Sequence, residues 1–458
     1  MRPRLAIVGG GLTGAAAAIA LLRRVTRPFE LVVTEPEADL GCGVAYGKAE
    51  PFHLLNVRAG KLGVIESLAG DFADWAGERL VRSRARDVPP DLSRAFLSRR
   101  QFGDYVQARL RSEIANRPDV ILVHRRTLAT AARRGLTGFE ISLDRSPPIN
   151  AQVLILASGY GRSAGVGRFG RNPFTDLDPE HARRARSALF VGTGMTFVDE
   201  FLRLRGLGFG GRATAISRHG LLPEVHRANE APWSLDTAIG DPRLRWLLSV
   251  FRSATQESDP SGAAAVNLAL GLREQLQILW QQLGTAEQKR FLRHLRTYWN
   301  VIRHRLPPEA YVPIRHAAES NELEIKAARV VDMNGGRVLL RSADGRSVEQ
   351  DFDLVFDCTG HRPEIGSPLV RSLIGQGVAC ADPHDLGLSI ERDGTAIDRL
   401  GRASRGLFAL GPLGQGSLYE ITAVPEIVAQ CARMADVVET RLGEGAFHAS
   451  WPELARAG

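Results

Sequence analysis

The feature that most constrains this chain is a glycine turn near its N-terminus. An apolar stretch over residues 4–8 runs directly into Gly9-x-Gly11-x-x-Gly14, and an alanine-rich helix is expected over residues 15–22. Gly9 permits a tight strand-to-helix turn, Gly11 lets a pyrophosphate approach the backbone, and Gly14 lets helix and strand pack closely. The phosphates would then lie at the positive end of the helix. The pattern predicts a dinucleotide-binding unit of the Rossmann type.

The following strand supports this interpretation. It is expected over residues 29–34 and ends at Glu35, 21 residues after Gly14. At this distance a Rossmann unit places an acidic side chain that accepts hydrogen bonds from a ribose. Three glycines alone are a weak signal, but strand, turn, helix, strand and acid occur here in the order that nucleotide binding requires. The alternative is a glycine-rich turn in an α/β domain that binds nothing.

A second strand-turn-helix segment lies in the middle of the chain. A strand is expected over residues 187–191, followed by Gly192-x-Gly194 and a helix over residues 196–204. The third glycine position is occupied by Phe197, where the fingerprint has a small residue for close packing. On its own this turn is weaker evidence than the first.

The residue after the next strand indicates which nicotinamide nucleotide this second unit would bind. The strand is expected over residues 213–217 and is followed by Arg218, where an NAD site would have an acid. A cationic side chain at this position can bind the 2′-phosphate of NADPH, so NADPH is favoured over NADH. The alternative is a solvated surface arginine in an arginine-rich chain.

Further apolar segments end at glycine, over residues 153–159, 353–360 and 406–411. Short apolar runs of this kind suit buried parallel strands whose ends meet a cofactor. A helix is expected from about Tyr419 to Arg441, with Glu420 in its first turn.

Composition and charge exclude several classes of protein. The chain has 458 residues, of which 44% are hydrophobic and 24% charged, as in soluble globular proteins of two or three domains. The net charge of +8 comes mostly from scattered arginines without interleaved aromatic residues, so no nucleic-acid partner is expected. The apolar runs are too short to span a bilayer, and no signal peptide is recognised. We therefore expect a cytoplasmic protein without a membrane partner.

Metal and dithiol chemistry have no sequence support. The four cysteines form no C-x-x-C pair, and the 11 histidines form no H-E-x-x-H motif. No metal site is predicted.

Several motifs, in one order along most of the chain, carry a resemblance to a known family. The motifs are the first glycine turn and residues 41–47, 53–57, 216–223, 298–305 and 418–426. Through them the chain resembles the FAD-NAD(P)-binding family of two-dinucleotide flavoproteins, which is related to the flavin N-hydroxylating monooxygenases. The resemblance implies an α/β protein with two Rossmann-type domains, one for FAD and one for NADPH.

The domains that follow from this resemblance are discontinuous. Residues 1–165 and 353–458 would form the FAD domain, and residues 166–352 the NADPH domain, with a helical insertion over about 225–310 that packs over the catalytic cleft. The helix from Tyr419 would point its positive end at the flavin ring. The residues expected to bind FAD are Gly9, Gly11, Thr13, Gly14, Glu35, Gly43, Tyr46, Asn56, Gly159, Gly411, Leu418 and Tyr419, and those expected to bind NADPH are Gly192, Gly194, Thr196 and Arg218.

Two segments depart from the family pattern. Phe197 replaces a small residue in the NADPH turn. Residues 59–63 stand where the family has a basic residue followed by Met-Ser, and Lys61 would keep the basic role.

The candidate substrate cluster lies in residues 298–305, where Arg303, His304 and Arg305 follow aromatic residues. Arginine forks bind carboxylates or phosphates in bidentate fashion, and the histidine can act as an acid or base near neutral pH. Three interpretations stay open: a clamp for a substrate carboxylate, a clamp for NADPH phosphates, or a basic helix end with a structural role.

Together, these observations predict an NADPH-dependent FAD monooxygenase that uses O2 to hydroxylate a nitrogen of an amino acid or another small anionic amine. Two alternatives remain: a flavin reductase or dehydrogenase without oxygen transfer, and a non-catalytic flavoprotein that senses redox state. The sequence leaves the substrate and the oligomeric state open.

Overall fold

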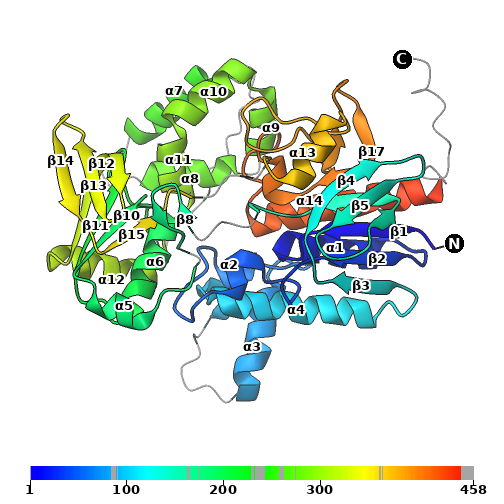
Figure 1. Cartoon of the computed structure of the whole chain (residues 1–458), viewed down its shortest axis with the longest axis horizontal. Coiled ribbons are helices and arrows are strands. Elements are labelled where there is room, and N and C mark those ends of the chain that lie inside the picture. The colour runs from blue at the N-terminus through cyan, green and yellow to red at the C-terminus, as the bar shows by residue number, and fades with distance from the viewer. Residues whose placement is uncertain are drawn as a thin grey trace. The chain divides into compact units, whose positions relative to one another are not determined.

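The computed structural model describes residues 2–83, 89, 91–161, 166–173, 175–227, 232, 243–256, 263–273, 275–360, 363 and 365–444. The chain forms two compact units (Figure 1). Unit 1 comprises Met1–Ala49, Val57–Gly161 and Arg362–Gly458, and unit 2 comprises Glu50–Asn56 and Arg162–His361.

Unit 1 is built on a six-stranded sheet in the order β16-β17-β7-β1-β2-β3. All neighbouring strands are parallel except β16 and β17. The strands are β1 (Arg4–Val8), β2 (Glu30–Thr34), β3 (Ile121–Arg125), β7 (Val153–Leu156), β16 (Thr395–Ile397) and β17 (Ala403–Ala409). Because the central strands are parallel, the glycines that follow β1, β7 and β17 meet at one edge of the sheet.

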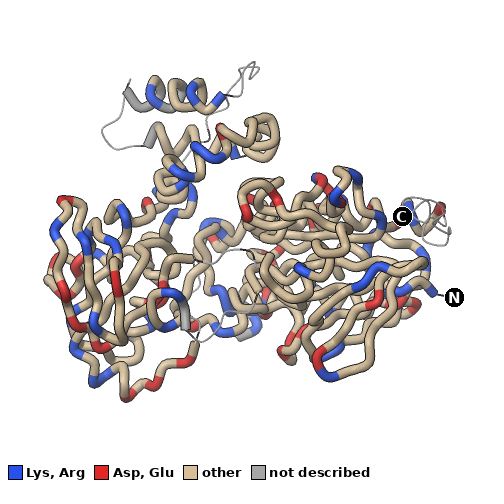
Figure 2. Tube along the Cα trace, turned by 45° about the horizontal axis from the view of Figure 1, so that its top comes forward, with Lys and Arg blue, Asp and Glu red and all other residues tan. Residues whose placement is uncertain are grey.

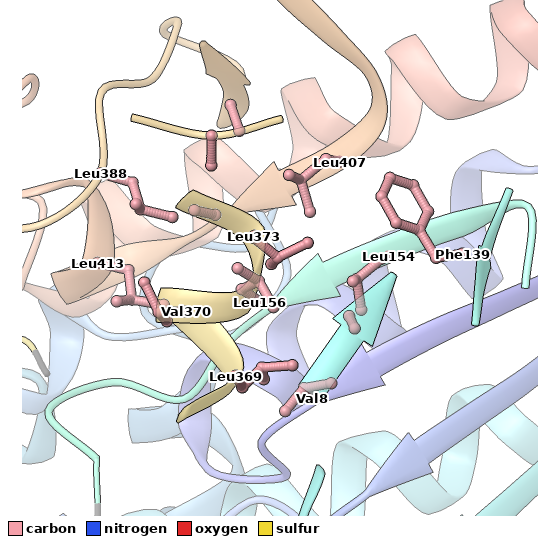
Figure 3. Close-up of a cluster of buried hydrophobic side chains, with 14 of the residues drawn as sticks. Val8, Phe139, Leu154, Leu156, Leu369, Val370, Leu373, Leu388, Leu407 and Leu413 are labelled. Carbon is pink, nitrogen blue, oxygen red and sulfur yellow. The ribbon is translucent and has the colours of Figure 1, made fainter. Parts of the chain in front are cut away.

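One face of this sheet packs on a small antiparallel sheet of β4 (Ala129–Arg134), β5 (Phe139–Leu143) and β6 (Ile149–Ala151), and on α13 (Pro368–Gly375). Figure 3 shows the apolar core between these elements, where Val8, Leu154, Leu156 and Leu407 meet Phe139 and the leucines of α13. Alternate strand residues point to opposite faces, so Ile7 and Ile155 face the side on which α1 (Leu12–Arg24) lies.

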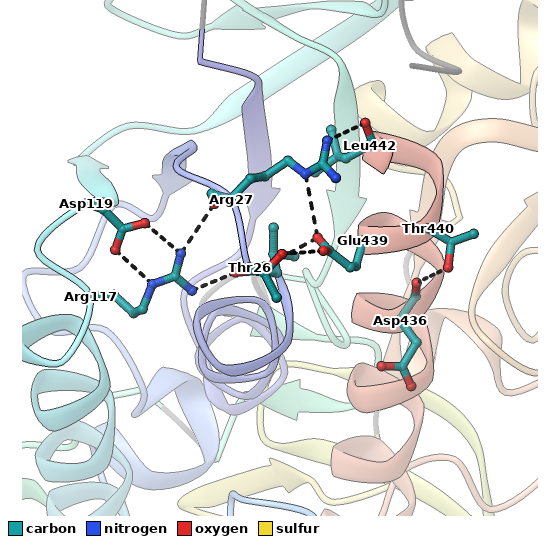
Figure 4. A network of polar contacts seen from close by, with 9 residues as sticks. Thr26, Arg27, Arg117, Asp119, Asp436, Glu439, Thr440 and Leu442 are labelled. Atoms are coloured by element: carbon teal, nitrogen blue, oxygen red, sulfur yellow. Dashed lines mark hydrogen bonds and ion pairs between the residues drawn. The ribbon is translucent and has the colours of Figure 1, made fainter. Parts of the chain in front are cut away.

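The long helices of unit 1 are α1, α3 (Asp71–Ser83), α4 (Arg99–Ala115) and α14 (Val424–Gly443). α1 contacts both α4 and α14, and its run of alanines permits these close approaches. Figure 4 shows how the end of α14 is tied to the segment after α1: Thr26 donates to Glu439 at 2.6 Å, and Arg27 donates to the Leu442 carbonyl at 2.6 Å. Short elements complete the unit: α2 (Gly43–Gly47), η1 (Ala59–Lys61), η2 (Leu92–Arg94) and η3 (Gly411–Gly414).

Unit 2 contains an eight-stranded sheet in the order β14-β13-β12-β11-β10-β15-β9-β8. Its parallel centre is formed by β10 (Ser187–Val191), β11 (Arg212–Ser217), β12 (Leu323–Asn334) and β15 (Leu354–Asp357). The other strands are β8 (Val166–Gly167), β9 (Gly170–Arg171), β13 (Arg337–Ser342) and β14 (Ser347–Asp351). The helices α5 (Pro179–Arg184), α6 (Met195–Gly206) and α12 (Pro308–Glu319) belong to the same core.

Helices make up most of the described part of the predicted insertion of unit 2, whose ends are joined by a β-bridge between Val225 and Leu306. The insertion contains α7 (Leu244–Gln256), α8 (Ala263–Leu272), α9 (Leu276–Gln282), α10 (Thr285–His294) and α11 (Arg296–Arg303). α8 contacts both α7 and α11, so these helices form a layer of their own within the unit.

The structure confirms the α/β class and the two Rossmann-type sheets, and it corrects two boundaries. We expected residue 353 to begin the return to the first domain, but β15 pairs with β10 in unit 2. We expected a helix from Tyr419, but α14 begins at Val424. Glu420 has a φ of 72°, a left-handed conformation that a helical turn excludes, so it does not lie in the first turn of this helix.

Candidate functional site

The first glycine turn has the geometry that the sequence predicts. Gly9 has a φ of 101°, and a Cβ atom there would lie 2.5 Å from the Ala157 carbonyl oxygen of the neighbouring strand end. A Cβ atom at Gly14 would overlap the Gly9 carbonyl oxygen. α1 begins immediately after Gly11. Gly9 and Gly14 are therefore required for the close passage of backbone at this turn, whereas a Cβ atom at Gly11 would make only an ordinary contact, 3.4 Å from the Gly43 Cα atom.

Glu35 lies beside the same turn, directly after β2. Its Oε2 accepts a hydrogen bond from the backbone N–H of Gly10 at 2.9 Å. This contact holds the carboxylate at the strand end where a Rossmann unit binds a ribose.

The segment around α2 covers the turn. The Gly41 N–H donates to the Gly10 carbonyl at 2.7 Å, and a Cβ atom at Gly43 would lie 3.0 Å from the Gly11 Cα atom. Tyr46 faces another direction: its ring packs edge-on against Phe102, with 5.1 Å between the ring centroids, and burial raises its pKa to about 12. Tyr46 is thus part of the core beneath α4.

Two other strand ends contribute to this edge of unit 1. Gly159, with a φ of 61°, has no described atom within 4 Å of where its Cβ would be, so the backbone there faces open space. Gly411 packs against Thr13, whose Oγ1 would lie 2.9 Å from a Gly411 Cβ atom. The Gly411 N–H donates to Oε1 of Gln430 at 2.8 Å, so this amide is already engaged within the protein.

The residues between η3 and α14 form a buried turn rather than the start of a helix. Leu418 and Tyr419 are both buried, and Glu420 is buried beside them. We expected the positive N-terminal end of a helix near Tyr419. In the structure this helix end lies at Val424, and Pro425 is in the first turn.

Sequence reasoning missed a polar group at this edge. Tyr160 follows Gly159 and is hydrogen-bonded to the side chain of Thr422. Burial is the main cause that raises the Tyr160 pKa to about 12, and the negative charge of Glu420 contributes to raising it. The only sequence signal was its position directly after a strand end that closes in Ser-Gly.

The second glycine turn, in unit 2, has the same geometry as the first. Gly192 has a φ of 118°, and a Cβ atom there would overlap the Cys358 carbonyl oxygen. Gly194 caps α6, which contains Thr196, and no described atom lies within 4 Å of where its Cβ would be.

Phe197 is accommodated because its side chain points into the core of unit 2. It is fully buried, and its ring centroid lies 5.3 Å from that of Phe190 and 5.9 Å from that of Phe201. The large residue therefore fills the space between α6 and the sheet.

Arg218 lies directly after β11, next to the second turn. Its side chain is exposed and donates from Nη2 to Oγ1 of Thr297 in α11 at 3.0 Å. Ser217 and Thr193 share a hydrogen bond of 2.9 Å, which ties this strand end to the glycine turn. Arg218 is therefore held at the position where a residue that binds the 2′-phosphate of NADPH is expected.

The basic cluster at the end of α11 divides into two environments. Arg303 ends the helix and is half-buried, and His304 caps it. Arg305 is only 4% exposed, which favours a structural role for this side chain over a clamp. Of the two arginines, Arg303 is the better candidate for contact with a ligand.

Asn56 lies in the same part of unit 2. His226 donates its backbone N–H to the Leu306 carbonyl at 2.9 Å, and its Nε2 lies 3.0 Å from the Asn56 carbonyl oxygen. His226 thus links the segment containing Asn56 to the residue that follows Arg305. Lys61 lies in unit 1, exposed at the end of η1.

Within the described residues, no group of three or more His, Cys, Asp and Glu side chains is arranged to hold a metal ion. No described helix is both long and apolar enough to cross a bilayer. Figure 2 shows Lys and Arg interspersed with acidic residues along both units.

Comparison with solved structures shows that other proteins share this fold. The ornithine N-hydroxylase of Kutzneria sp. 744 matches with a TM-score of 0.62 and 16% identity, over 96% of this chain and 100% of that one. The cadaverine monooxygenase of Erwinia amylovora matches with a TM-score of 0.63 and 13% identity, over 96% and 94%. The bacillithiol disulfide reductase of Staphylococcus aureus matches with a TM-score of 0.54 and 12% identity, over 96% and 99%.

Comparison with the curated proteins finds no match. Residues 6–161, which contain the first glycine turn, Glu35, α2 and Gly159, match the model of the FAD-NAD(P)-binding family. This match confirms, over these residues, the resemblance recognised in the sequence.

Proposed function

We propose that the chain binds FAD on unit 1 and NADPH on unit 2 and is an oxidoreductase. The observation that carries this proposal is the presence of two glycine turns with the same geometry, at Gly9 and at Gly192, each followed directly by a helix. Each turn brings backbone N–H groups and a helix N-terminus to a place that suits a pyrophosphate.

The residues of unit 1 fit FAD. Gly11 and Gly43 lie close together, since a Cβ atom at Gly43 would lie 3.0 Å from the Gly11 Cα atom. No described atom lies within 4 Å of where a Gly159 Cβ atom would be, which leaves room for the cofactor beside its backbone. Glu35 would hold the ribose, and the turn around Leu418 and Tyr419 would lie toward the flavin. In unit 2, Gly192, Gly194 and Thr196 would hold the pyrophosphate of NADPH, and Arg218 would hold its 2′-phosphate.

We further propose that the reaction is hydroxylation of a nitrogen on an amino acid or another small anionic amine. Bound FAD would supply the capacity to accept a hydride and to activate O2. The chain's own residues would position the substrate: Arg303 would pair with its carboxylate, His304 would exchange a proton near neutral pH, and Lys61 and Asn56 would supply further polar contacts. One structural neighbour supports this choice, since it is named an ornithine N-hydroxylase, and ornithine carries both a carboxylate and a side-chain amine.

A first prediction tests the cofactors and the reaction together. The purified protein should be yellow, and NADPH should bleach its flavin under anaerobic conditions. With ¹⁸O₂ and a panel of amino acids and diamines, at least one substrate should increase NADPH oxidation and give a product with one labelled oxygen on nitrogen. A colourless protein that cannot be reconstituted with FAD would refute the proposal.

The alternative proposal is a reductase or dehydrogenase, since the disulfide reductase of Staphylococcus aureus shares the fold. In that case NADPH would reduce the flavin, but every amine tested would yield hydrogen peroxide and no labelled product. A third outcome, a flavin that stays oxidised under saturating NADPH without oxygen, would favour a redox sensor.

A second prediction concerns the choice of nucleotide. Arg218→Ala should lower kcat/KM for NADPH by about 10- to 100-fold, because it removes a charged donor from the 2′-phosphate. The value for NADH should stay within about twofold, because NADH lacks this phosphate. Steady-state kinetics with both nucleotides measure the effect.

The matched control for this prediction is Thr297→Val, which keeps the arginine but removes its partner at 3.0 Å. It should show a smaller loss in the same direction. Equal losses for NADPH and NADH in Arg218→Ala would mean that Arg218 does not contact the 2′-phosphate.

A further inference from the structure

Lys61 lies in a segment of unit 1 whose backbone packs closely against its neighbours on both sides. A Cβ atom at Gly60 would lie 2.7 Å from Cβ and 2.8 Å from the carbonyl oxygen of Ser93. One at Gly63 would overlap the Leu68 carbonyl oxygen. The segment is thus pressed against η2 before Lys61 and against the loop that leads into α3 after it. The backbone around Lys61 is therefore fixed, while its side chain is exposed to solvent.

Two buried residues anchor the chain directly after Lys61. Leu62 and Val64 are each 1% exposed. The Leu62 carbonyl accepts a hydrogen bond at 3.1 Å from the N–H of Phe72, in the first turn of α3. The Val64 N–H donates to Oη of Tyr105, in α4, at 3.0 Å. Because a buried N–H needs an acceptor, the Tyr105 hydroxyl holds this part of the segment in place.

The Tyr105 hydroxyl is itself held by a buried network. It donates to Oδ2 of Asp71, the first residue of α3, at 2.7 Å. Arg109, one turn further along α4, donates to the same carboxylate from Nε at 2.8 Å and from Nη2 at 2.6 Å. Burial, followed by the hydrogen bond to Asp71, raises the pKa of Tyr105. The hydroxyl therefore stays protonated, gives its one proton to Asp71 and offers its oxygen to the Val64 N–H.

We propose that Tyr105 is a positioning residue for Lys61, because its hydroxyl fixes the segment that presents the Lys61 ammonium group to the substrate. This inference rests on the proposed function, in which Lys61 supplies a polar contact to the amine substrate. A lysine ammonium is carried on a flexible four-carbon stem, so a fixed backbone limits the volume that it samples. An ammonium group that is held in this way loses less entropy when it binds an anionic substrate. The hydroxyl of Tyr105 would therefore act on substrate binding and not on the binding or reduction of FAD.

The first measurement is hydrogen exchange of the backbone amides over residues 59–64 in the purified protein, which needs no substrate. Tyr105→Phe removes only the hydroxyl, so the ring keeps its packing on Phe72, with 5.3 Å between the ring centroids. Exchange over residues 59–64 should become about tenfold faster or more, because the Val64 N–H loses its acceptor. Unchanged exchange would overturn the proposal, whatever the activity of the protein.

Trp75→Phe is the matched control for this measurement. Trp75 is 9% exposed and packs on the Tyr105 ring, with 5.6 Å between the ring centroids, but it takes no part in the hydrogen bonds to Val64 and Asp71. The smaller ring should lower the Tm through lost packing, while exchange over residues 59–64 stays close to the wild-type rate. If Trp75→Phe speeds this exchange as much as Tyr105→Phe does, the effect is a general loosening of the core and the proposal is wrong.

The second measurement is a double-mutant cycle in steady-state kinetics, with an amine that the wild-type protein hydroxylates. Tyr105→Phe should raise the KM for this amine by about three- to tenfold, with kcat, FAD content and reduction by NADPH almost unchanged. Lys61→Ala should raise the KM further, and Tyr105→Phe added to Lys61→Ala should cause no additional rise, because both act through one contact.

The outcomes separate this inference from the proposed function. If the KM effects of Tyr105→Phe and Lys61→Ala multiply, the two residues act independently, Tyr105 is only structural, and the inference is overturned. A wild-type protein that hydroxylates no amine would refute the proposed function instead. In that case the exchange measurement still decides whether the Tyr105 hydroxyl fixes the segment around Lys61.

Discussion

Gly14→Ala is expected to yield a protein that purifies without FAD and unfolds at a lower temperature. The added methyl group would overlap the Gly9 carbonyl oxygen and lie 3.4 Å from Cγ2 of Ile7. A backbone carbonyl cannot move aside as a flexible side chain does, so α1 must shift away from β1. Overpacking of this kind costs about 1–3 kcal/mol or more, and the shift displaces the N–H groups proposed to hold the pyrophosphate. The FAD content of the purified protein and its Tm measure both effects.

Gly194→Ala is the matched control for this substitution. Gly194 has a φ of −83°, which any residue can adopt, and no described atom lies within 4 Å of its Cβ position. This variant should fold and keep its FAD, while its KM for NADPH should rise because the methyl group faces the proposed pyrophosphate. If Gly14→Ala retains FAD at the wild-type level, the assignment of FAD to this turn is wrong.

The sequence predicted the parts of the fold that depend on local backbone geometry. Gly9, Gly14 and Gly192 lie where neighbouring backbone passes too closely for a side chain, and such positions leave a recognisable pattern. The acid after the second strand could also be predicted, because Glu35 reaches the turn from a fixed distance along the chain.

The parts that depend on contacts between distant segments were not predictable in this way. Residues 50–56 belong to unit 2 because His53 bonds the Asp199 carbonyl and His226 approaches the Asn56 carbonyl. Nothing in the local pattern of residues 50–56 indicates these partners. α14 begins later than the sequence predicts for a similar reason. Glu420 has a left-handed backbone conformation in a turn that is buried together with Leu418 and Tyr419.

Burial also separates residues that the sequence presents as equivalent. Arg303 and Arg305 are two positions apart and have the same chemistry, yet only Arg303 is partly accessible. Arg305→Ala is therefore expected to lower stability through lost packing of its aliphatic stem, whereas Arg303 can be replaced with less structural effect.

Arg303→Ala is expected to lower kcat/KM for the amine substrate by about 30- to 5000-fold, while leaving FAD content and substrate-free reduction by NADPH almost unchanged. A carboxylate that enters a partly dry site loses hydration and needs a fixed charged partner. Truncating one partner of such a pair costs about 2–5 kcal/mol, which corresponds to this range. Arg293→Ala, at an exposed position of α10, should leave all three quantities unchanged. Loss of NADPH affinity without substrate would assign Arg303 to the nucleotide, and loss of FAD or of folding would assign it a structural role.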